Sequence, residues 1–245
     1  MCGFRVLLFD LDGTLLPMDT GQFLQAYLTT LAPHFAPFMP PEQFVQELLR
    51  ATREMVENTE GSKTNAEVFW ESFLGKTSFD PEQTFPVFEQ FYLSVFPKLH
   101  VHTQPTPLAR EVLTKAAARG CELVLATNPV FPRIAIEERL RWAGIADVPF
   151  RLITDYETMH YCKPNLSYFQ EILEKVEVDT ADCLMIGNDP AEDMVAAELG
   201  ISTYLVEDCA VVRDEHTAAN INHRGMLEEL VSFLDSRSFN NGHHK

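Results

Sequence analysis

The chain has 245 residues, a formal net charge of −17 and a sequence pI of about 4.8. This acidic balance argues against a nucleic-acid partner, because phosphate backbones require a basic binding surface. Apolar runs are too short to span a membrane, and Asp10 interrupts the N-terminal run before it could serve as a signal. We therefore expect a soluble, cytoplasmic protein. Its five scattered cysteines favour buried, reduced thiols over disulfides or a zinc site.

The first predicted element is a buried strand over residues 5–9, and two carboxylates follow it directly. Asp10 and Asp12 are separated by one residue, and Gly13 and Thr14 come next. Carboxylates at the end of a sheet are costly unless a metal ion or hydrogen-bond donors neutralise them. An ordinary strand followed by an Asp-Gly turn fits the same letters. The later segments of the chain decide between these two interpretations.

Residues 17–100 show helical periodicity throughout, with aromatic side chains at helical spacing. Thr64 and Glu67 have the spacing of a capping box at the start of a helix. We expect this segment to form a separate helical domain in which the aromatic residues make the core. The residues expected in a solvated loop between its helices are Ser62, Lys63 and Asn65.

After residue 100, short apolar runs alternate with helical patterns. The further strands are predicted at residues 122–127, 150–153, 182–187 and 203–206, and the helices at 107–119, 133–143, 165–176 and 190–199. Alternation of this kind predicts a parallel sheet covered by helices on both faces. In such sheets ligands bind beyond the carboxyl ends of the strands.

Polar residues stand at those strand ends and at nearby helix starts. They are Thr127 and Asn128, Lys163, Asn188 and Asp189, and Asp193. The expected juxtaposition of several carboxylates with a single lysine requires a divalent cation, because like charges in one site repel each other. Phosphoryl transfer uses such an arrangement, since it needs an oxygen nucleophile, neutralisation of phosphate charge and a proton donor.

In this order the residues resemble the four motifs of the haloacid dehalogenase superfamily, whose members are mostly magnesium-dependent phosphatases. These motifs are Asp-x-Asp-x-Thr, a Ser or Thr, a Lys, and an acidic pair, and the matches span residues 10–193. The resemblance implies an α/β fold, a doubly wound parallel sheet with strand order 5-4-1-2-3 and an inserted helical cap. The core would comprise residues 1–16 and 101–245, and the cap residues 17–100.

The resemblance also implies a Mg²⁺-dependent phosphatase that hydrolyses a small phosphorylated metabolite. Asp10 would form an aspartyl-phosphate, and Asp12 would protonate the leaving alcohol and then activate water. The phosphate-binding residues would be Thr127, Asn128 and Lys163. The Mg²⁺ ligands would be Asp10, the backbone carbonyl of Asp12, and Asp189. Asp193 and Asn188 would support them.

Asn188 is the one departure from the motifs, because it stands between Gly187 and the first Asp of the acidic pair. Either Asn188 or Asp189 could therefore take the metal position. The four-residue spacing between Asp189 and Asp193 favours Asp189.

Three other functions are open on this sequence. A metal-free 2-haloacid dehalogenase is disfavoured by Asp12, since that branch generally lacks a carboxylate at this position. A phosphonate hydrolase, or the related phosphomutase, is a closer variant; the hydrolase needs a suitably placed cap lysine, and only Lys63, Lys76 and Lys98 are available. A non-catalytic binding protein would be expected to have lost at least one catalytic residue, and no loss is visible apart from the ambiguity at Asn188. Acidic residues outnumber basic ones in residues 17–100. This balance does not favour a polyanionic substrate such as a bisphosphate, although charges on the outer face of the cap could also account for it.

Overall fold

A computed structural model describes residues 3–77, 79–211 and 220–236 of the chain. Within these residues, six parallel strands form one sheet in the order β3-β2-β1-β4-β5-β6. The strands are β1 (Val6–Phe9), β2 (Glu122–Leu125), β3 (Leu152–Ile153), β4 (Cys183–Gly187), β5 (Ser202–Val206) and β6 (His223–Gly225). The predicted order of the first five strands is confirmed. The sequence analysis missed β6, because His-Arg-Gly has no apolar pattern.

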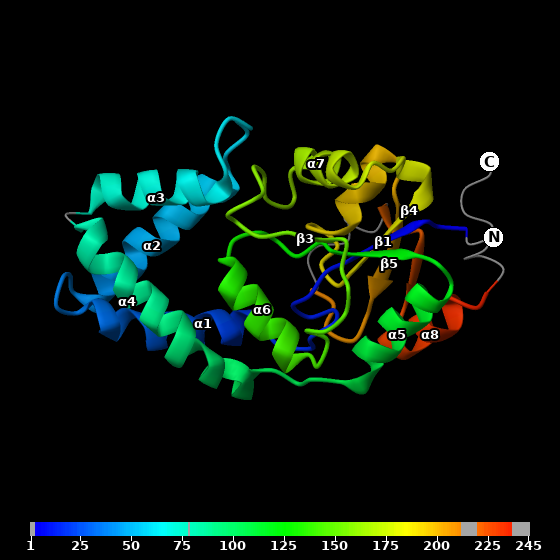
Figure 1. Ribbon diagram of the computed structural model, residues 1–245, viewed down its shortest axis with the longest axis horizontal. Coiled ribbons are helices and arrows are strands. Elements are labelled where there is room, and N and C mark those ends of the chain that lie inside the picture. The colour runs from blue at the N-terminus through cyan, green and yellow to red at the C-terminus, as the bar shows by residue number, and fades with distance from the viewer. Residues whose placement is uncertain (1–2, 78, 212–219, 237–245) are drawn as a thin grey trace.

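Helices cover both faces of the sheet (Figure 1). The core helices are α5 (Pro107–Ala118), α6 (Arg133–Trp142), α7 (Leu166–Val176) and α8 (Leu227–Phe233). Successive residues of a strand point to opposite faces. Leu7 and Phe9 accordingly pack in the cluster that includes side chains of α5, α6 and α8, whereas Val6 and Leu8 pack against α7. This two-sided burial confirms the predicted doubly wound α/β fold.

Short 3₁₀ helices complete the described elements: η1 (Ala32–Phe35), η2 (Phe96–His102), η3 (Thr180–Asp182) and η4 (Met194–Leu199). The α-helix predicted over residues 190–199 is therefore wrong. The Asp189 side chain accepts hydrogen bonds from the backbone N–H groups of Ala191 and Glu192, at 2.8 and 3.3 Å. This local turn delays the start of the helix.

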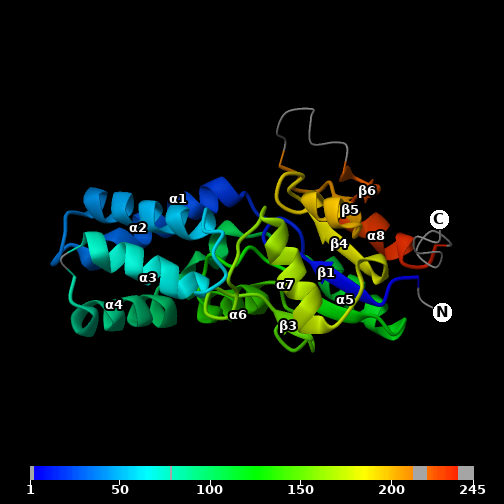
Figure 2. The same cartoon turned by 90° about the horizontal axis from the view of Figure 1, so that it is seen from above.

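The helical insert, residues 17–100, contains α1 (Thr20–Leu31), α2 (Pro41–Val56), α3 (Asn65–Lys76) and α4 (Pro81–Ser94). Figure 2 shows these helices beside the sheet domain and beyond one end of it. The two ends of the insert lie together, because Met18 and Thr103 form an antiparallel bridge. The expected helical cap is thus present, and its exact boundaries at residues 17 and 100 stay a prediction.

The start of α3 combines a confirmed expectation with a wrong one. The capping box of Thr64 and Glu67 is present. Ser62 and Lys63 are exposed as expected, but Asn65 is fully buried. Its side chain donates a hydrogen bond to the backbone carbonyl of Tyr161 at 3.2 Å, so Asn65 joins the insert to the core instead of lying in a solvated loop.

Stacked phenylalanines make the interior of the insert, as the aromatic spacing predicts. Phe35 lies 4.3 Å from Phe44 and 4.4 Å from Phe88 between ring centroids. The same apolar cluster continues into the sheet domain through Phe23 and Tyr27 of α1. The described helices include none with the length and apolarity needed to cross a membrane.

The Phe35–Phe44 stack predicts a large loss of stability on truncation. Phe44→Ala should lower the free energy of unfolding by about 3–5 kcal/mol, because Phe44 is fully buried and its removal leaves a cavity. Phe38→Ala is the matched control, since Phe38 contacts the same cluster but is 36% exposed. Urea denaturation of both variants measures the difference, and equal losses would contradict this account of the insert core.

Candidate functional site

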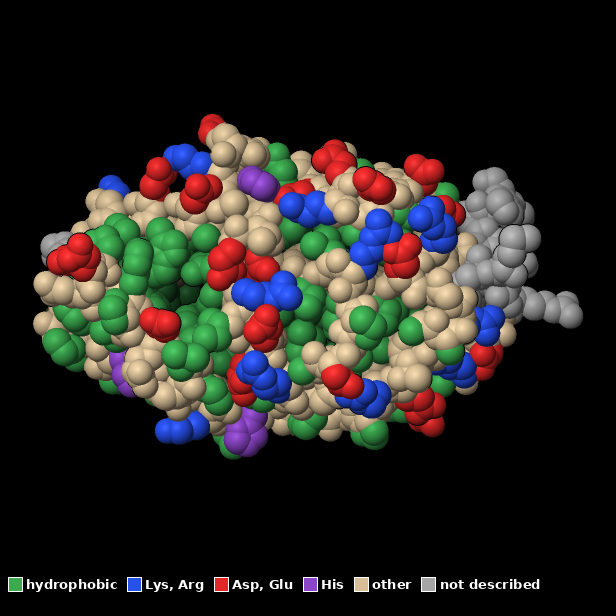
Figure 3. All heavy atoms as spheres, viewed as in Figure 1, with side chains coloured by type: hydrophobic (Ala, Val, Ile, Leu, Met, Phe, Trp, Pro, Cys, Tyr) green, Lys and Arg blue, Asp and Glu red, His purple; other side chains and the backbone are tan. Residues whose placement is uncertain are grey.

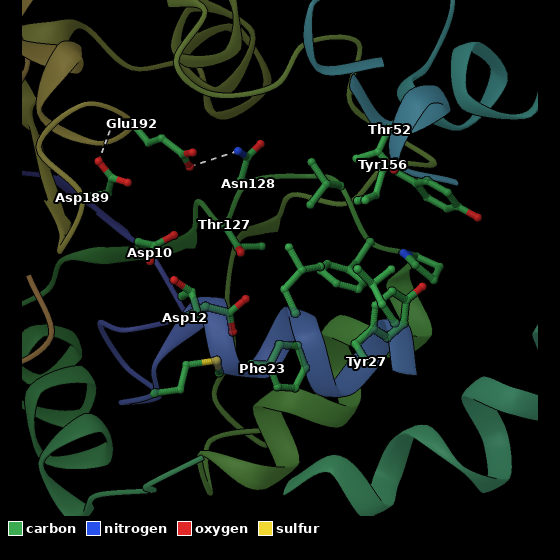
Figure 4. Close-up of a pocket in the computed structure, with 18 of the residues that line it drawn as sticks. Asp10, Asp12, Phe23, Tyr27, Thr52, Thr127, Asn128, Tyr156, Asp189 and Glu192 are labelled. Carbon is green, nitrogen blue, oxygen red and sulfur yellow. Dashed lines mark hydrogen bonds between the residues drawn. The ribbon is translucent and has the colours of Figure 1, made fainter. Parts of the chain in front are cut away.

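Three strand ends bring the predicted site residues together. Asp10 follows β1, Thr127 follows β2 by two residues, and Asp189 follows β4 by two. Strand β1 lies between β2 and β4, so these residues share the carboxyl edge of the sheet. Figure 4 shows Asp10 between Asp189 and Thr127, with Asp12 close by.

Lys163 is buried among the carboxylates, with only 1% of its surface exposed. Its Nζ donates to Asp10 Oδ1 at 2.9 Å and to Asp193 Oδ1 at 2.6 Å. Burial disfavours the cation, but the charges of Asp10 and Asp193 outweigh it and hold the pKa of Lys163 well above its usual value. Burial raises the pKa of Asp193 to about 7, against the lowering effect of Lys163. The charges of this triad are therefore strongly interdependent.

Asn128 positions the segment that carries Lys163. Its Oδ1 accepts from the backbone N–H of Lys163 at 3.2 Å, and its Nδ2 donates to Glu192 Oε2 at 3.0 Å (Figure 4). Both ends of the amide thus bind protein groups, although Asn128 also lines the cavity described below. Thr127 also lines this cavity, and its backbone carbonyl accepts a hydrogen bond from the Tyr168 hydroxyl at 2.9 Å.

Asp12, which is partly exposed, forms an ion pair with the buried Arg139 of α6, and the sequence analysis missed this pair. Arg139 is 1% exposed, and its guanidinium lies 4.5 Å from the centre of the Phe131 ring. Burial raises the pKa of Asp12, and the charge of Arg139 opposes that rise. The buried face of α6 consists of Ala135, Ile136, Arg139 and Leu140. This helical spacing was the signal in the sequence that could have identified Arg139, because it places an arginine on an apolar face.

Asn188 and Asp189 point to different partners. Asn188 Nδ2 donates to the Cys209 carbonyl at 2.8 Å, and its Oδ1 lies 3.1 Å from the Thr14 hydroxyl. The same hydroxyl lies 3.2 Å from Asp10 Oδ2. The Asp189 backbone N–H donates to Asp193 Oδ2 at 3.0 Å, and its side chain accepts from the N–H groups of Ala191 and Glu192. The amide of Asn188 thus serves structural contacts on both sides.

No three His, Cys, Asp or Glu side chains of the described residues form a ready metal-binding group. The donor set nevertheless fits Mg²⁺, which takes oxygen ligands and keeps several waters. The carboxylates of Asp10 and Asp189 and the Asp12 carbonyl are oxygen donors at one sheet edge. The expectation that Lys163 is the single cation of the site was wrong, since Arg139 is a second cation paired with Asp12. The cluster of Asp10, Asp12, Asp189 and Asp193 still holds more carboxylates than cations.

A cavity of about 380 Å³ begins at these carboxylates and extends under the insert. Asp10, Asp12 and Asp189 line one end, and Phe23 and Tyr27 of α1 line the other. Figure 4 shows this division between acidic and aromatic walls. The volume lies in the range of small-molecule sites.

Gly13 allows the chain to turn tightly beside Asn188, and this predicts a specific cost for a side chain there. Gly13 has φ +87°, and an added Cβ would lie 2.3 Å from Asn188 Nδ2. Gly120 has φ +84° but no neighbour within 4 Å, so it is a matched control. Gly120→Ala should lose roughly 1–2 kcal/mol of unfolding free energy from the positive φ. Gly13→Ala should lose roughly 1–3 kcal/mol more from the clash.

Chemical denaturation of the two variants tests this comparison. Equal losses would show that the contact between Gly13 and Asn188 is looser than the structure indicates.

Comparison with known proteins places the chain in a family. A model of the haloacid dehalogenase-like hydrolases matches residues 4–200. No curated protein matches the sequence. A HAD phosphatase from Thermococcus onnurineus has a similar structure, with 17% identity and a TM-score of 0.58 over 94% of this chain and 98% of that one. An L-2-haloacid dehalogenase from Xanthobacter autotrophicus has 16% identity and a TM-score of 0.59, over 95% and 99%.

A third similar structure is a putative beta-phosphoglucomutase from Thermotoga maritima, with 20% identity and a TM-score of 0.56 over 95% of this chain and 99% of that one. At such identities the structural likenesses show a common fold and do not assign an activity. The family assignment rests on the match over residues 4–200. This chain belongs to the haloacid dehalogenase-like hydrolases.

Proposed function

We propose that this hydrolase is a Mg²⁺-dependent phosphatase that acts on a small phosphate monoester through an aspartyl-phosphate. The observation that carries the proposal is the pair of carboxylates, Asp10 and Asp12, at one end of a ligand-sized cavity. Each has its own buried cation, Lys163 for Asp10 and Arg139 for Asp12. Two carboxylates in different environments suit two different roles.

Asp10 is the proposed nucleophile. Its carboxylate attacks phosphorus, the bond from phosphorus to the leaving oxygen breaks, and the phosphoryl group remains on Asp10. Lys163 holds the carboxylate in place through the 2.9 Å hydrogen bond to Oδ1, and its charge favours an incoming phosphate. Thr127 lines the cavity with Asp10, and its proposed role is to donate a hydrogen bond to a phosphate oxygen.

Asp12 is the proposed general acid and base. It gives a proton to the leaving alcohol, and the resulting carboxylate then takes a proton from the water that hydrolyses the aspartyl-phosphate. Arg139 fixes the direction of the Asp12 side chain. A bound Mg²⁺ ion would supply neutralisation of the phosphate charge. Asp10, the Asp12 carbonyl and Asp189 are the proposed ligands, with Asp193 and Asn188 in support.

The alternatives are less well supported. Asp12 lines the cavity beside Asp10, and a metal-free dehalogenase has no use for a second carboxylate there. A phosphonate hydrolase needs a lysine in the cavity, but Lys63, Lys76 and Lys98 are exposed and none lines it. Lys63 is instead paired with Glu71 at 2.6 Å.

Substitution of the two carboxylates should separate their roles. Asp10→Asn should abolish turnover, because an amide is a poor nucleophile. Asp12→Asn should lose ~10²–10⁴-fold on alkyl phosphates, whose leaving groups need a proton, and less on aryl phosphates. Rapid-quench mass spectrometry with an aryl phosphate should detect the phosphoryl group on Asp10. A phosphoryl group on Asp12 would reverse the two assignments.

The metal requirement provides a separate prediction. Hydrolysis of an aryl phosphate should stop with chelator and return with Mg²⁺. Asp189→Asn should raise the Mg²⁺ concentration needed for half-maximal rate strongly, because it removes a charged ligand. Asn188→Ala should raise it less, since the Asn188 amide binds the Cys209 carbonyl and approaches Thr14. Magnesium titrations of both variants test this ranking, and full activity in chelator would refute the phosphatase proposal.

A further inference from the structure

The far end of the cavity is lined mainly by apolar and aromatic side chains, most of which come from the insert. All four insert α-helices contribute, and the principal residues are Phe23, Tyr27, Leu48, Phe69, Trp70 and Phe88. Leu24 and Leu49 also line it and are 42% and 38% exposed, so the apolar lining continues to the surface. Figure 3 shows hydrophobic side chains gathered around a hollow over the insert.

Among the described residues, the charged side chains that line this cavity are all acidic. Its ionisable acidic residues are Asp10, Asp12, Asp189, Glu192 and Asp193, and no described lysine, arginine or histidine lines it. Lys163 lies behind the carboxylates at the sheet edge, and Arg139 of α6 is paired with Asp12 and packs on the Phe131 ring. A second phosphate or a carboxylate on the leaving group would therefore meet no cation at the insert end, and its desolvation would be uncompensated.

The polar groups at the insert end are few, and the hydroxyls of Tyr27, Tyr92 and Thr52 already have partners within the insert. The hydroxyls of Tyr27 and Tyr92 lie 2.8 Å apart and bind each other. The Thr52 hydroxyl donates to the Leu48 carbonyl at 2.9 Å. A sugar placed here would bury several hydroxyls without partners, which is costly.

We propose that the leaving group of the substrate is an uncharged, apolar alcohol, so that the substrate is a phosphate monoester whose only anionic group is the phosphate. This inference rests on the proposed phosphatase function and specifies its substrate class. The phosphate lies at Asp10 and Lys163, and the apolar group fills the cavity between α1, α2, α3 and α4. Hydrolysis adds water, breaks the bond from phosphorus to the alcohol oxygen, and releases the alcohol and inorganic phosphate.

A homologous series of n-alkyl phosphates tests the proposal. With Mg²⁺, kcat/KM should rise from ethyl to butyl, hexyl and octyl phosphate by about four-fold for each methylene group buried, until the cavity is full. A hexose 6-phosphate and a hexose bisphosphate should both be poorer substrates than hexyl phosphate. Their hydroxyls and second charge have no partners at the insert end.

Three variants at two threonines locate the effect. Thr52 lines the cavity, whereas Thr29 of α1 is exposed and does not, and each hydroxyl donates to the carbonyl four residues earlier. Thr52→Lys should flatten the rise of kcat/KM with chain length, because it places a cation at the apolar end. Thr29→Lys should keep the rise unchanged. Thr52→Val is uncharged and has nearly the same size as threonine, so it should also keep the rise of kcat/KM with chain length. It therefore shows whether any change at position 52 disturbs folding.

The possible results distinguish a failure of the proposed substrate class from a failure of the proposed phosphatase function. A rise of kcat/KM with chain length that Thr52→Lys flattens supports both. If the enzyme hydrolyses aryl phosphate but kcat/KM for the alkyl phosphates does not depend on chain length, the substrate class is overturned and the phosphatase proposal stands. The same holds if the hexose phosphates are better substrates than hexyl phosphate. Failure to hydrolyse any phosphate ester in Mg²⁺ overturns the phosphatase proposal, and the substrate class falls with it.

Discussion

The buried ammonium group of Lys163 is the constraint on which the site depends. A lysine that is 1% exposed needs paired carboxylates, because an isolated charge in the protein interior is strongly destabilising. Asp10 and Asp193 supply them, and the Asn128 side chain holds the Lys163 backbone. One cation thus fixes the end of β1, the start of η4 and the segment after β2 relative to one another. The carboxylates of the site stay close together because this charge lies between them.

The two parts of the chain contribute different properties to the cavity. The sheet edge provides the charged groups, which have fixed positions because parallel strands end there. The insert provides an apolar surface from helices that are packed on their own aromatic core. Arg139 connects the two, because it leaves a core helix, pairs with Asp12 and stacks on Phe131, which also contacts Tyr27 of the insert.

Sequence reasoning found the residues whose position follows from topology. Asp10, Thr127 and Asp189 come together because they follow neighbouring parallel strands, although the strand order itself came from the family resemblance. Arg139 was missed because its partner Asp12 is 127 residues away, so the spacing of α6 could place the arginine on an apolar face but could not identify its partner. The turn before η4 depends on side-chain hydrogen bonds of Asp189 that compete with a helix. The burial of Asn65 depends on the packing of the insert against the core, which local pattern does not encode.

The apolar cluster runs without interruption from the insert into the sheet domain, and this determines how the chain loses its structure. Phe23 contacts Trp142 of α6, with ring centroids 6.1 Å apart, and Tyr27 contacts Phe131 at 5.3 Å. Detaching the insert would expose these rings to water at roughly 25 cal/mol for each Å². We therefore expect the insert and the sheet domain to unfold together, because melting of the insert would uncover the cavity and remove the packing partners of Trp142 and Phe131.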